Sequence, residues 1–343
     1  MKLNEYLKSG KTYMIAEMSA NHGGSKEKAL QIVEAAAKAN ADCLKIQTYT
    51  ADTMTLDSSK PYFKLTKGLW AGYTRYALYK EGTLPWEWQV DIKKRCEELG
   101  IDFLSTAFDF SSVDFLESIG AEAYKIASFE LTDIPLVQYI AKTGKPIILS
   151  CGMGTKEEIE EAVQTIRKAG NDQIVLLKCT SEYPAKFEDM NISLIPQMAK
   201  DFNCAVGLSD HSIGDSIAVG AVALGSKVIE KHFCITRKEK TPDSAFSMEA
   251  DEYQQMVGHI RNLEAAIGNA AYILSEAEMN GRINRRSVFV SRDIDQGEVI
   301  SKENVKIVRP AHGLHPRCYF DVLGKKATRY LEAGEPLKEQ DYE

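Results

Sequence analysis

Eight short runs of apolar and β-branched residues recur along the chain, and segments with helical periodicity separate them. The runs occupy residues 12–18, 42–49, 101–108, 123–129, 146–152, 174–180, 204–210 and 227–233. Continuously apolar strands that alternate with helices indicate a parallel sheet whose outer face is covered. Eight such units within about 250 residues predict an α/β fold of the closed (β/α)8 type, the TIM barrel, rather than an open sheet.

The pattern changes after Gly268, and this change predicts the domain organisation. Residues 1–268 are expected to form the catalytic barrel, and residues 269–284 a linker. Residues 285–343 contain short β-runs, a turn and a Pro/Gly/His loop, so we expect a small β-rich domain there. At about 60 residues such a domain has a marginal core and is expected to dock on another surface.

Composition excludes several classes of function. The seven cysteines are scattered without a CxxC pair, which argues for reduced thiols and against a zinc site. The sequence has no signal region and no apolar stretch long enough to span a membrane, so we expect a cytoplasmic protein without membrane contact. A net charge of −7 gives no footprint for nucleic acid and requires local cations to bind an anionic substrate.

Polar residues gather at the carboxyl ends of the expected strands, where the active site of a barrel enzyme lies. Isolated serines or lysines would be turn residues or outward-pointing side chains, but that interpretation does not explain their recurrence on nearly every strand. The residues are Glu17, Lys45, Gln47, Lys125, Ser128, Glu130, Ser150, Ser181, Tyr183, Ser209, Asp210, His211, Glu230 and His232.

His211 and His232 follow neighbouring strands at similar depth. Two imidazoles without a thiolate suit an octahedral divalent ion such as Mn²⁺, which would polarise a carbonyl oxygen. The alternative is two hydrogen-bonded core histidines. Asp210 is expected to cap or hold His211, and Glu230 to orient or bind the ion.

Lys45 and Lys125 are expected to direct positive charge into the barrel mouth, where serine hydroxyls surround them. Cations together with hydroxyl donors form a phosphate or carboxylate site. Glu17 and Glu130 add acid–base capacity. The long connection 50–86 is rich in aromatic residues, which predicts an ordered lid or an interface.

Eight stretches of this chain resemble the nonulosonic acid synthases, the sialic acid synthase family. They are IAEMSANHGGS (15–25), LKIQTY (44–49), YKIASFE (124–130), ILSCGM (148–153), LKCTSEYP (177–184), GLSDHS (207–212), VIEKHF (228–233) and VRPAHG (308–313). The resemblance runs through nearly the whole chain. It implies a metal-dependent barrel and an antifreeze-like (SAF) domain at residues 285–343, which crosses to the partner's site in a domain-swapped homodimer.

The resemblance also implies a reaction and roles for residues. The family condenses phosphoenolpyruvate (PEP) with an N-acetylated sugar aldehyde, using Mn²⁺ or Mg²⁺. The ion would be held by His211 and His232. PEP would be held by Lys45, Lys125, Ser128, Ser150, Ser181, Tyr183 and Ser209. The sugar would be contacted by Glu17, Gln47, Asp243 and Arg309, the last from the other subunit. Glu130 would position or deprotonate a water, with the roles of Glu130 and Glu17 open to exchange.

The resemblance is closer to the pseudaminic acid synthase branch than to the sialic acid synthases. The stretches KIQTYTADTMTL (45–56) and KGLWAGYTRYALY (67–79) fall at substrate-facing loops and carry this distinction. Ser181 stands where sialic acid synthases usually have asparagine. The sequence leaves three alternatives: a synthase of N-acetylneuraminic or legionaminic acid, a metal-free Schiff-base aldolase using Lys125 or Lys45, and a non-catalytic carbohydrate-binding protein.

Overall fold

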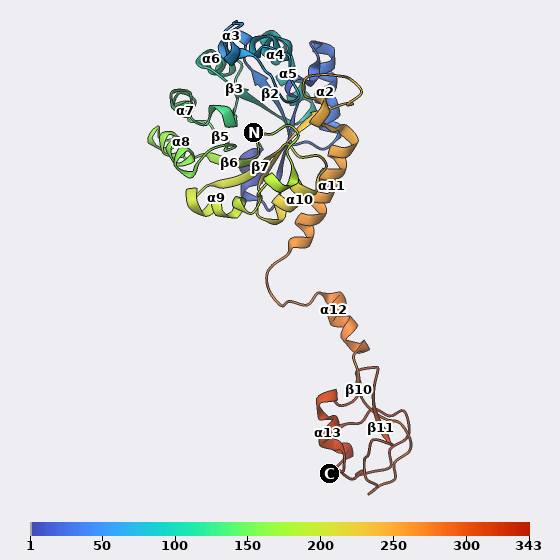
Figure 1. The fold of residues 1–343 in the computed structure, drawn as a ribbon. Coiled ribbons are helices and arrows are strands. Elements are labelled where there is room, and N and C mark those ends of the chain that lie inside the picture. The colour runs from blue at the N-terminus through green and yellow to red at the C-terminus, as the bar shows by residue number, and fades with distance from the viewer. Residues whose placement is uncertain (1) are drawn as a thin grey trace. The chain divides into compact units, whose positions relative to one another are not determined.

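Eight parallel strands of the computed structural model pair in chain order, and the first also pairs with the eighth, so the sheet closes into a barrel (Figure 1). The expected (β/α)8 architecture is therefore confirmed. The structure describes residues 2–343, which divide into two compact units between Gly268 and Asn269. The strands of the barrel are β1 (Tyr13–Glu17), β2 (Cys43–Thr48), β3 (Asp102–Ala107), β4 (Tyr124–Ile126), β5 (Ile147–Ser150), β6 (Ile174–Cys179), β7 (Ala205–Asp210) and β8 (Val228–Cys234).

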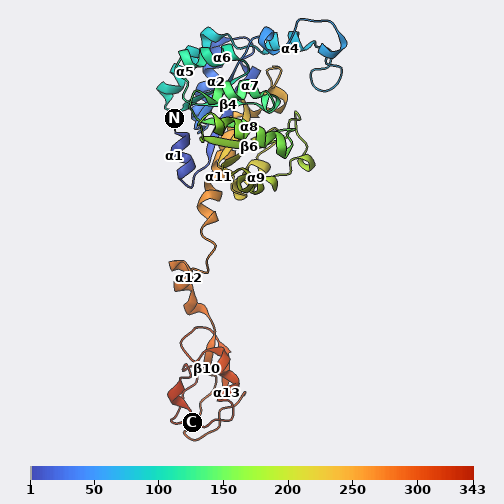
Figure 2. The same ribbon diagram turned by 90° about the vertical axis from the view of Figure 1, so that its left-hand side faces the viewer.

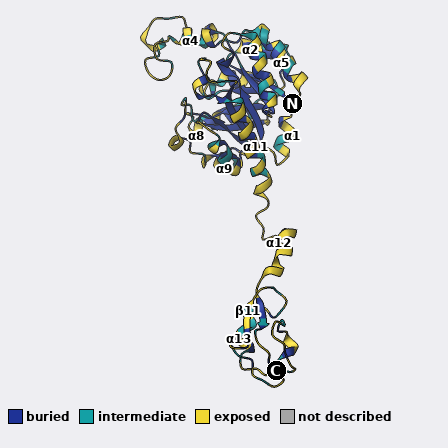
Figure 3. Cartoon of the chain, turned by 90° about the vertical axis from the view of Figure 1, so that its right-hand side faces the viewer, coloured by how far each residue is buried: buried dark blue, intermediate teal, exposed yellow. Residues whose placement is uncertain are grey.

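Helices cover the outside of the barrel, with their apolar faces turned toward the strands (Figure 3). In α8, for example, Ile159, Ala162, Val163 and Ile166 recur at helical spacing and are buried. A two-residue strand, β9 (Met248–Glu249), pairs with the end of β8. The covering helices are α2 (Lys26–Lys38), α5 (Trp86–Leu99), α6 (Phe110–Ser118), α7 (Ile134–Ala141), α8 (Lys156–Lys168), α9 (Leu194–Phe202), α10 (Ser216–Ala223) and α11 (Ala250–Ile267).

The interior of the barrel is apolar at its amino-terminal end. Side chains alternate across a strand, so every second residue points inward. Tyr13, Leu104, Ile148 and Val175 come from four strands and form one buried cluster there. Helix α1 (Leu3–Lys8) packs Leu3 against this cluster and closes that end.

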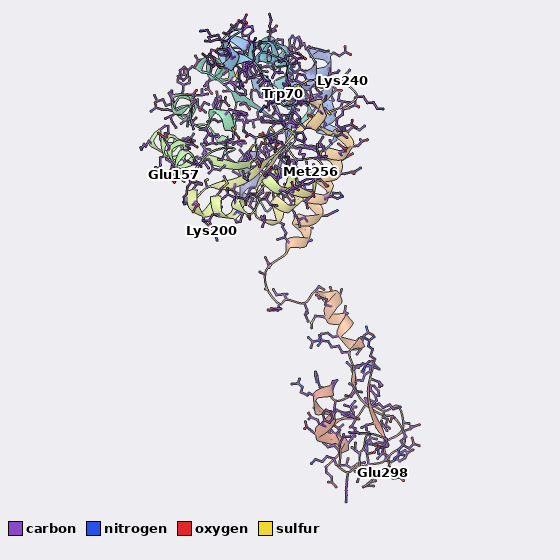
Figure 4. All side chains as sticks on the ribbon, viewed as in Figure 1. Trp70, Glu157, Lys200, Lys240, Met256 and Glu298 are labelled. Carbon is purple, nitrogen blue, oxygen red and sulfur yellow. The ribbon has the colours of Figure 1, made fainter. Side chains whose placement is uncertain are left out.

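The aromatic connection after β2 is ordered. It contains α3 (Ala51–Met54) and α4 (Arg75–Gly82) and stands out from the barrel (Figure 2). The indole of Trp70, labelled in Figure 4, donates a hydrogen bond to the carbonyl oxygen of Pro242 at 3.0 Å. The connection is thereby tied to the loop that follows β8.

The second unit contains helix α12 (Glu276–Gly281) and an antiparallel pair, β10 (Ser287–Val290) and β11 (Val305–Val308). Its own core is built from ten buried apolar residues that include Val288, Ile300 and Leu331. A short helix, α13 (Tyr319–Val322), packs on that core through Val322. Because α12 lies within residues 269–284, the expected linker carries regular structure.

All seven cysteines are free thiols, as expected for a chain without disulfides. Within residues 2–343, none of the helices is long and apolar enough to cross a lipid bilayer.

Candidate active site

Polar residues continue the inward-facing rows of the barrel at its carboxyl end. On β1 the row begins with Tyr13 and Ile15 in the apolar cluster and ends with Glu17. The same alternation brings one or two polar side chains from most strands to the carboxyl end of the barrel, in two successive inward positions. The inward-facing residues there are Glu17, Lys45, Gln47, Thr106, Lys125, Ser150, Cys179, Ser209, Glu230 and His232.

Lys45 lies at the centre of a buried ionic group. Its Nζ is 2.9 Å from Oε2 of Glu17 and 3.5 Å from Oε1 of Glu230, and it donates to the hydroxyl of Thr106 at 3.1 Å. The hydroxyl of Ser209 donates to Oε1 of Glu230 at 3.0 Å. The side chains of Lys45, Glu17 and Glu230 are each no more than 5 % exposed. Lys125 is also buried, so both lysines of the site point into the barrel and not to solvent.

The two carboxylates of this group differ in acidity. Burial raises the pKa of Glu17 to about 7, and the negative charge of Glu230 adds to this against the pull of Lys45. Burial also opposes ionisation of Glu230, but Lys125 and Lys45 outweigh it and hold its pKa below the ordinary value. The arrangement thus contains one ionised carboxylate and one that can exchange a proton near neutral pH.

Lys125 lies beside a group of small hydroxyl and backbone donors. Its Nζ donates to the hydroxyl of Ser150 at 2.6 Å and to the carbonyl oxygen of Ile126 at 2.9 Å. Burial lowers its pKa. Because the lysine is desolvated and only partly neutralised, an anion placed next to it would be strongly attracted.

Because Gly152 has no side chain, the hydroxyls of Ser128 and Ser181 can lie close to its backbone. Its backbone N–H donates to Oγ of Ser128 at 3.0 Å. A Cβ at this position would lie 2.3 Å from Oγ of Ser181 and 2.7 Å from Oγ of Ser128, closer than side chains approach one another. The two serines and Lys125 thus provide hydroxyl and ammonium donors of the kind that bind a phosphate or carboxylate group.

His211 and His232 lie side by side, with ring centroids 5.3 Å apart. Nδ1 of His211 lies 2.9 Å from the carbonyl oxygen of Thr180. Since a carbonyl can only accept, this nitrogen carries a proton, and Nε2 is the nitrogen of this ring that a metal ion could take. Nδ1 of His232 is buried without a hydrogen-bond partner. Burial and the neighbouring His211 hold the pKa of His232 well below its usual value, so that ring is neutral and able to bind a metal.

The donor set therefore fits a divalent cation with two imidazole ligands. No group of three or more His, Cys, Asp or Glu side chains able to hold a metal ion occurs among residues 2–343. An ion here would take its remaining ligands from water or substrate. This is the open coordination that Lewis-acid catalysis requires.

A cavity of about 510 Å³ opens above these groups. Its polar lining includes Gln47, Glu130, His232 and Asp243, and Tyr183 also borders it. Burial raises the pKa of Glu130 to about 7, and one oxygen of this carboxylate, Oε2, is buried without a partner. Part of the apolar lining comes from the connection after β2, so that connection forms a wall of the site. The apolar lining residues include Ala20, Tyr49, Met54, Leu65, Trp70, Leu78, Tyr79, Phe108, Ala127, Phe129, Pro242 and Phe246.

Asp210 does not hold His211 as we expected. It faces the outside of the barrel, where its Oδ2 lies 2.7 Å from Nζ of Lys231 and its Oδ1 accepts from the N–H and hydroxyl of Ser212. Lys231 also donates to the carbonyl oxygens of Ser212 and Gly214 at 2.6 and 2.8 Å. This buried pair fixes the loop that follows His211.

Other residues of the site were not predicted from the sequence. Thr106 hydrogen-bonds Lys45, and the hydroxyl of Ser19 donates to Asp243 at 2.5 Å. Cys179, expected to be core filler, places its sulfur 3.8 Å from Nδ1 of His211. Arg309 belongs to the second unit, where it is exposed.

Comparison with known proteins gives matches along nearly the whole chain. Residues 32–272 match the NeuB family, and residues 285–343 match the SAF domain. The chain is 44% identical over 342 residues to the pseudaminic acid synthase of Campylobacter jejuni strain 81-176, covering 100% of both proteins. It is 38% identical over 331 residues to the pseudaminic acid synthase of Helicobacter pylori, covering 96% of this chain and 97% of that one.

Among solved structures, the N-acetylneuraminic acid synthetase of Leptospira borgpetersenii, determined in complex with citrate, superposes with a TM-score of 0.71. It shares 30% sequence identity, and the match covers 79% of this chain and 90% of that chain.

Proposed function

The chain belongs to the NeuB family, and from that premise we propose that it is a pseudaminic acid synthase. It condenses PEP with 2,4-diacetamido-2,4,6-trideoxy-L-altrose to give pseudaminic acid and phosphate. The observation that carries this proposal is the 44% identity to a pseudaminic acid synthase over the full length of both proteins, barrel and SAF domain included. The polar groups at the mouth of the barrel suit the two substrates.

The anionic substrate fits the floor of the site. Lys125 and Lys45 would neutralise the phosphate and carboxylate of PEP, and Ser128, Ser150 and Ser181 would donate hydrogen bonds to their oxygens. Ser209 and Tyr183 complete the proposed PEP site. Because these donors are fixed before the substrate arrives, they stabilise developing charge without reorganisation.

The sugar fits the cavity above, where Gln47 and Asp243 offer hydrogen-bond partners for its hydroxyl groups. Glu17, which is buried beside Lys45, is the third proposed sugar contact. His211 and His232 would hold Mn²⁺ or Mg²⁺ at its aldehyde end. A bound cation supplies Lewis-acid polarisation of the aldehyde oxygen.

In the proposed reaction, C3 of PEP attacks the aldehyde carbon and forms the new C–C bond. Positive character develops at C2, a water adds there, and the bond between C2 and the phosphate oxygen breaks. Glu130 takes the proton from that water, and Glu17 keeps Lys45 aligned. Glu130 suits this role because its buried oxygen has no other partner and its pKa is raised to about 7.

Phosphate release from PEP tests the proposal directly. The purified protein is supplied with Mn²⁺ and one of three sugars: the altrose derivative, the diacetamido sugar that leads to legionaminic acid, or N-acetylmannosamine. The highest kcat/KM is expected with the altrose derivative. A preference for either other sugar would assign the enzyme to a sibling activity. Trapping of a substrate adduct by borohydride, with activity that survives EDTA, would instead indicate a Schiff-base aldolase.

We further propose a cytoplasmic homodimer in which Arg309 reaches the partner subunit's site and binds an acyl group of the sugar. Mixing two inactive homodimers, Glu130→Gln and Arg309→Ala, tests the exchange. In a swapped heterodimer one site combines an intact barrel with an intact SAF domain, so activity reappears on mixing. If Arg309 served its own chain, the mixture would show only the average of the two variants.

A further inference from the structure

Arg75 is a cation that lines the cavity and is not among the residues proposed to bind PEP. It is the one lysine or arginine among the residues that line the 510 Å³ space. Its guanidinium makes no hydrogen bond or ion pair with any described residue, 2–343. Arg75 is exposed, so its five N–H donors are accessible to solvent and to a molecule in the cavity. The side chain is thus free to bind something that enters the cavity.

The surroundings of Arg75 are apolar. Arg75, Leu78, Tyr79 and Gly82 lie at positions i, i+3, i+4 and i+7 of α4, so they share one face of the helix, and all four line the cavity. Leu65 is held beside the start of the helix, because its N–H donates to the carbonyl oxygen of Tyr73 at 2.9 Å. The helix therefore presents the guanidinium of Arg75 next to the methyl groups of Leu78 and the ring of Tyr79.

This combination fits a neutral acceptor better than an anion. The same cavity carries the carboxylates of Glu130, Asp133 and Asp243, which disfavour a second negatively charged group. An acetamido group matches both halves of the face: its carbonyl oxygen accepts from the guanidinium, and its methyl group packs on leucine side chains.

We propose that Arg75, with Leu78 and Leu65, binds the second acetamido group of a diacetamido sugar and so selects it over monoacetamido sugars. The inference rests on the proposed function, in which the substrate carries two such groups and Arg309 serves one of them. It makes α4 the element of this chain that distinguishes diacetamido from monoacetamido sugars.

The test compares Arg75→Met with Lys80→Met, an exposed lysine of the same helix that does not line the cavity. Phosphate release is measured with the diacetamido sugar and with an analogue that has a hydroxyl in place of the 4-acetamido group. Loss of hydrogen bonds to a charged group is expected to lower kcat/KM of Arg75→Met for the diacetamido sugar about 10- to 100-fold. Its kcat/KM for the analogue, and both values for Lys80→Met, should stay within about twofold of wild type.

Arg75→Lys keeps the positive charge but not the planar guanidinium with its paired N–H donors. Its kcat/KM for the diacetamido sugar is therefore expected to lie between those of Arg75→Met and wild type. Equal losses with both sugars, or no loss at all, would overturn the inference while the proposed function stands. A wild-type enzyme that releases no phosphate with the diacetamido sugar would overturn the proposed function, and this inference with it.

Discussion

Replacing Gly152 with alanine should close the proposed phosphate pocket without disturbing the fold. The new Cβ would lie 2.3 Å from Oγ of Ser181 and 2.7 Å from Oγ of Ser128. Both hydroxyls end flexible side chains and can rotate away, although Ser128 then gives up the hydrogen bond from the N–H of residue 152. Cβ of Ser128 would lie 3.1 Å from the new Cβ and has to shift by a few tenths of an ångström. The backbone at Gly152 has no positive φ that would strain an alanine.

The magnitude follows from the two hydroxyls that are turned away. A hydrogen bond to a charged group contributes about 1.5–3 kcal/mol, so losing two costs at least about 3 kcal/mol of binding free energy for PEP. Since about 1.4 kcal/mol is a factor of ten, the Kd for PEP should rise roughly 100-fold. The extra methyl group also occupies space that a phosphate oxygen would need, which adds to the loss.

Isothermal titration with PEP and Mn²⁺ measures the effect. The control is Gly258→Ala in α11, where a Cβ meets no atom within 4 Å and the helix should become slightly more stable. Both variants should unfold within a few degrees of wild type, and only Gly152→Ala should lose affinity. If Gly152→Ala bound PEP with the wild-type Kd, the serines would have no part in binding it and the assignment of the pocket would be wrong.

Three more outcomes are expected. Because burial raises the pKa of Glu130 to about 7, kcat/KM should rise with pH through that value as the base ionises. Glu130→Gln should bind PEP normally but keep only a residual rate, and that rate should lack the rise with pH. Ionisation of the substrate phosphate affects wild type and variant alike. EDTA should stop phosphate release, and Mn²⁺ should restore it. His211→Ala should weaken Mn²⁺ binding in titrations at least about tenfold. Full activity in EDTA would exclude a requirement for a metal ion. Lys231→Met should lower the free energy of urea unfolding by about 3–5 kcal/mol, because it leaves Asp210 buried without its partner. The control Lys94→Met, at an exposed position, should change that free energy by less than about 0.5 kcal/mol. Equal effects would contradict a structural role for the Asp210–Lys231 pair.

The barrel could be predicted from the sequence because its strands are continuously apolar and its helices are amphipathic, and both patterns are local. The gathering of polar residues at one end of the barrel could also be predicted, since parallel strands share one carboxyl end. The direction of an individual side chain could not. An outward-pointing Lys45 remained an open alternative, and only closure of the barrel determines which of two alternating positions faces the interior.

The segments SDHS and EKHF illustrate this. Asp210 and Lys231 each stand next to a residue of the site, yet both face outward and pair with each other. His232 and Glu230, one position to either side of Lys231, face inward. A sequence shows that polar residues are clustered but not how alternation divides them between two environments.

The role of the aromatic connection depended on a contact that no local pattern reveals. Trp70 finds its hydrogen-bond partner at Pro242, 172 residues away in the chain. The same holds for Gly152, whose importance comes from two hydroxyls brought together by neighbouring strands. Both signals appear only when distant segments meet.

Because α1 closes the amino-terminal end of the barrel, substrates would enter and products leave at the carboxyl end. Lys45 and Lys125 lie one inward position deeper in the barrel than Gln47 and Ala127, which border the cavity. A sugar seated in the cavity would therefore cover the proposed anion site from the carboxyl end. We expect PEP to bind before the sugar, and phosphate to leave after the nine-carbon acid.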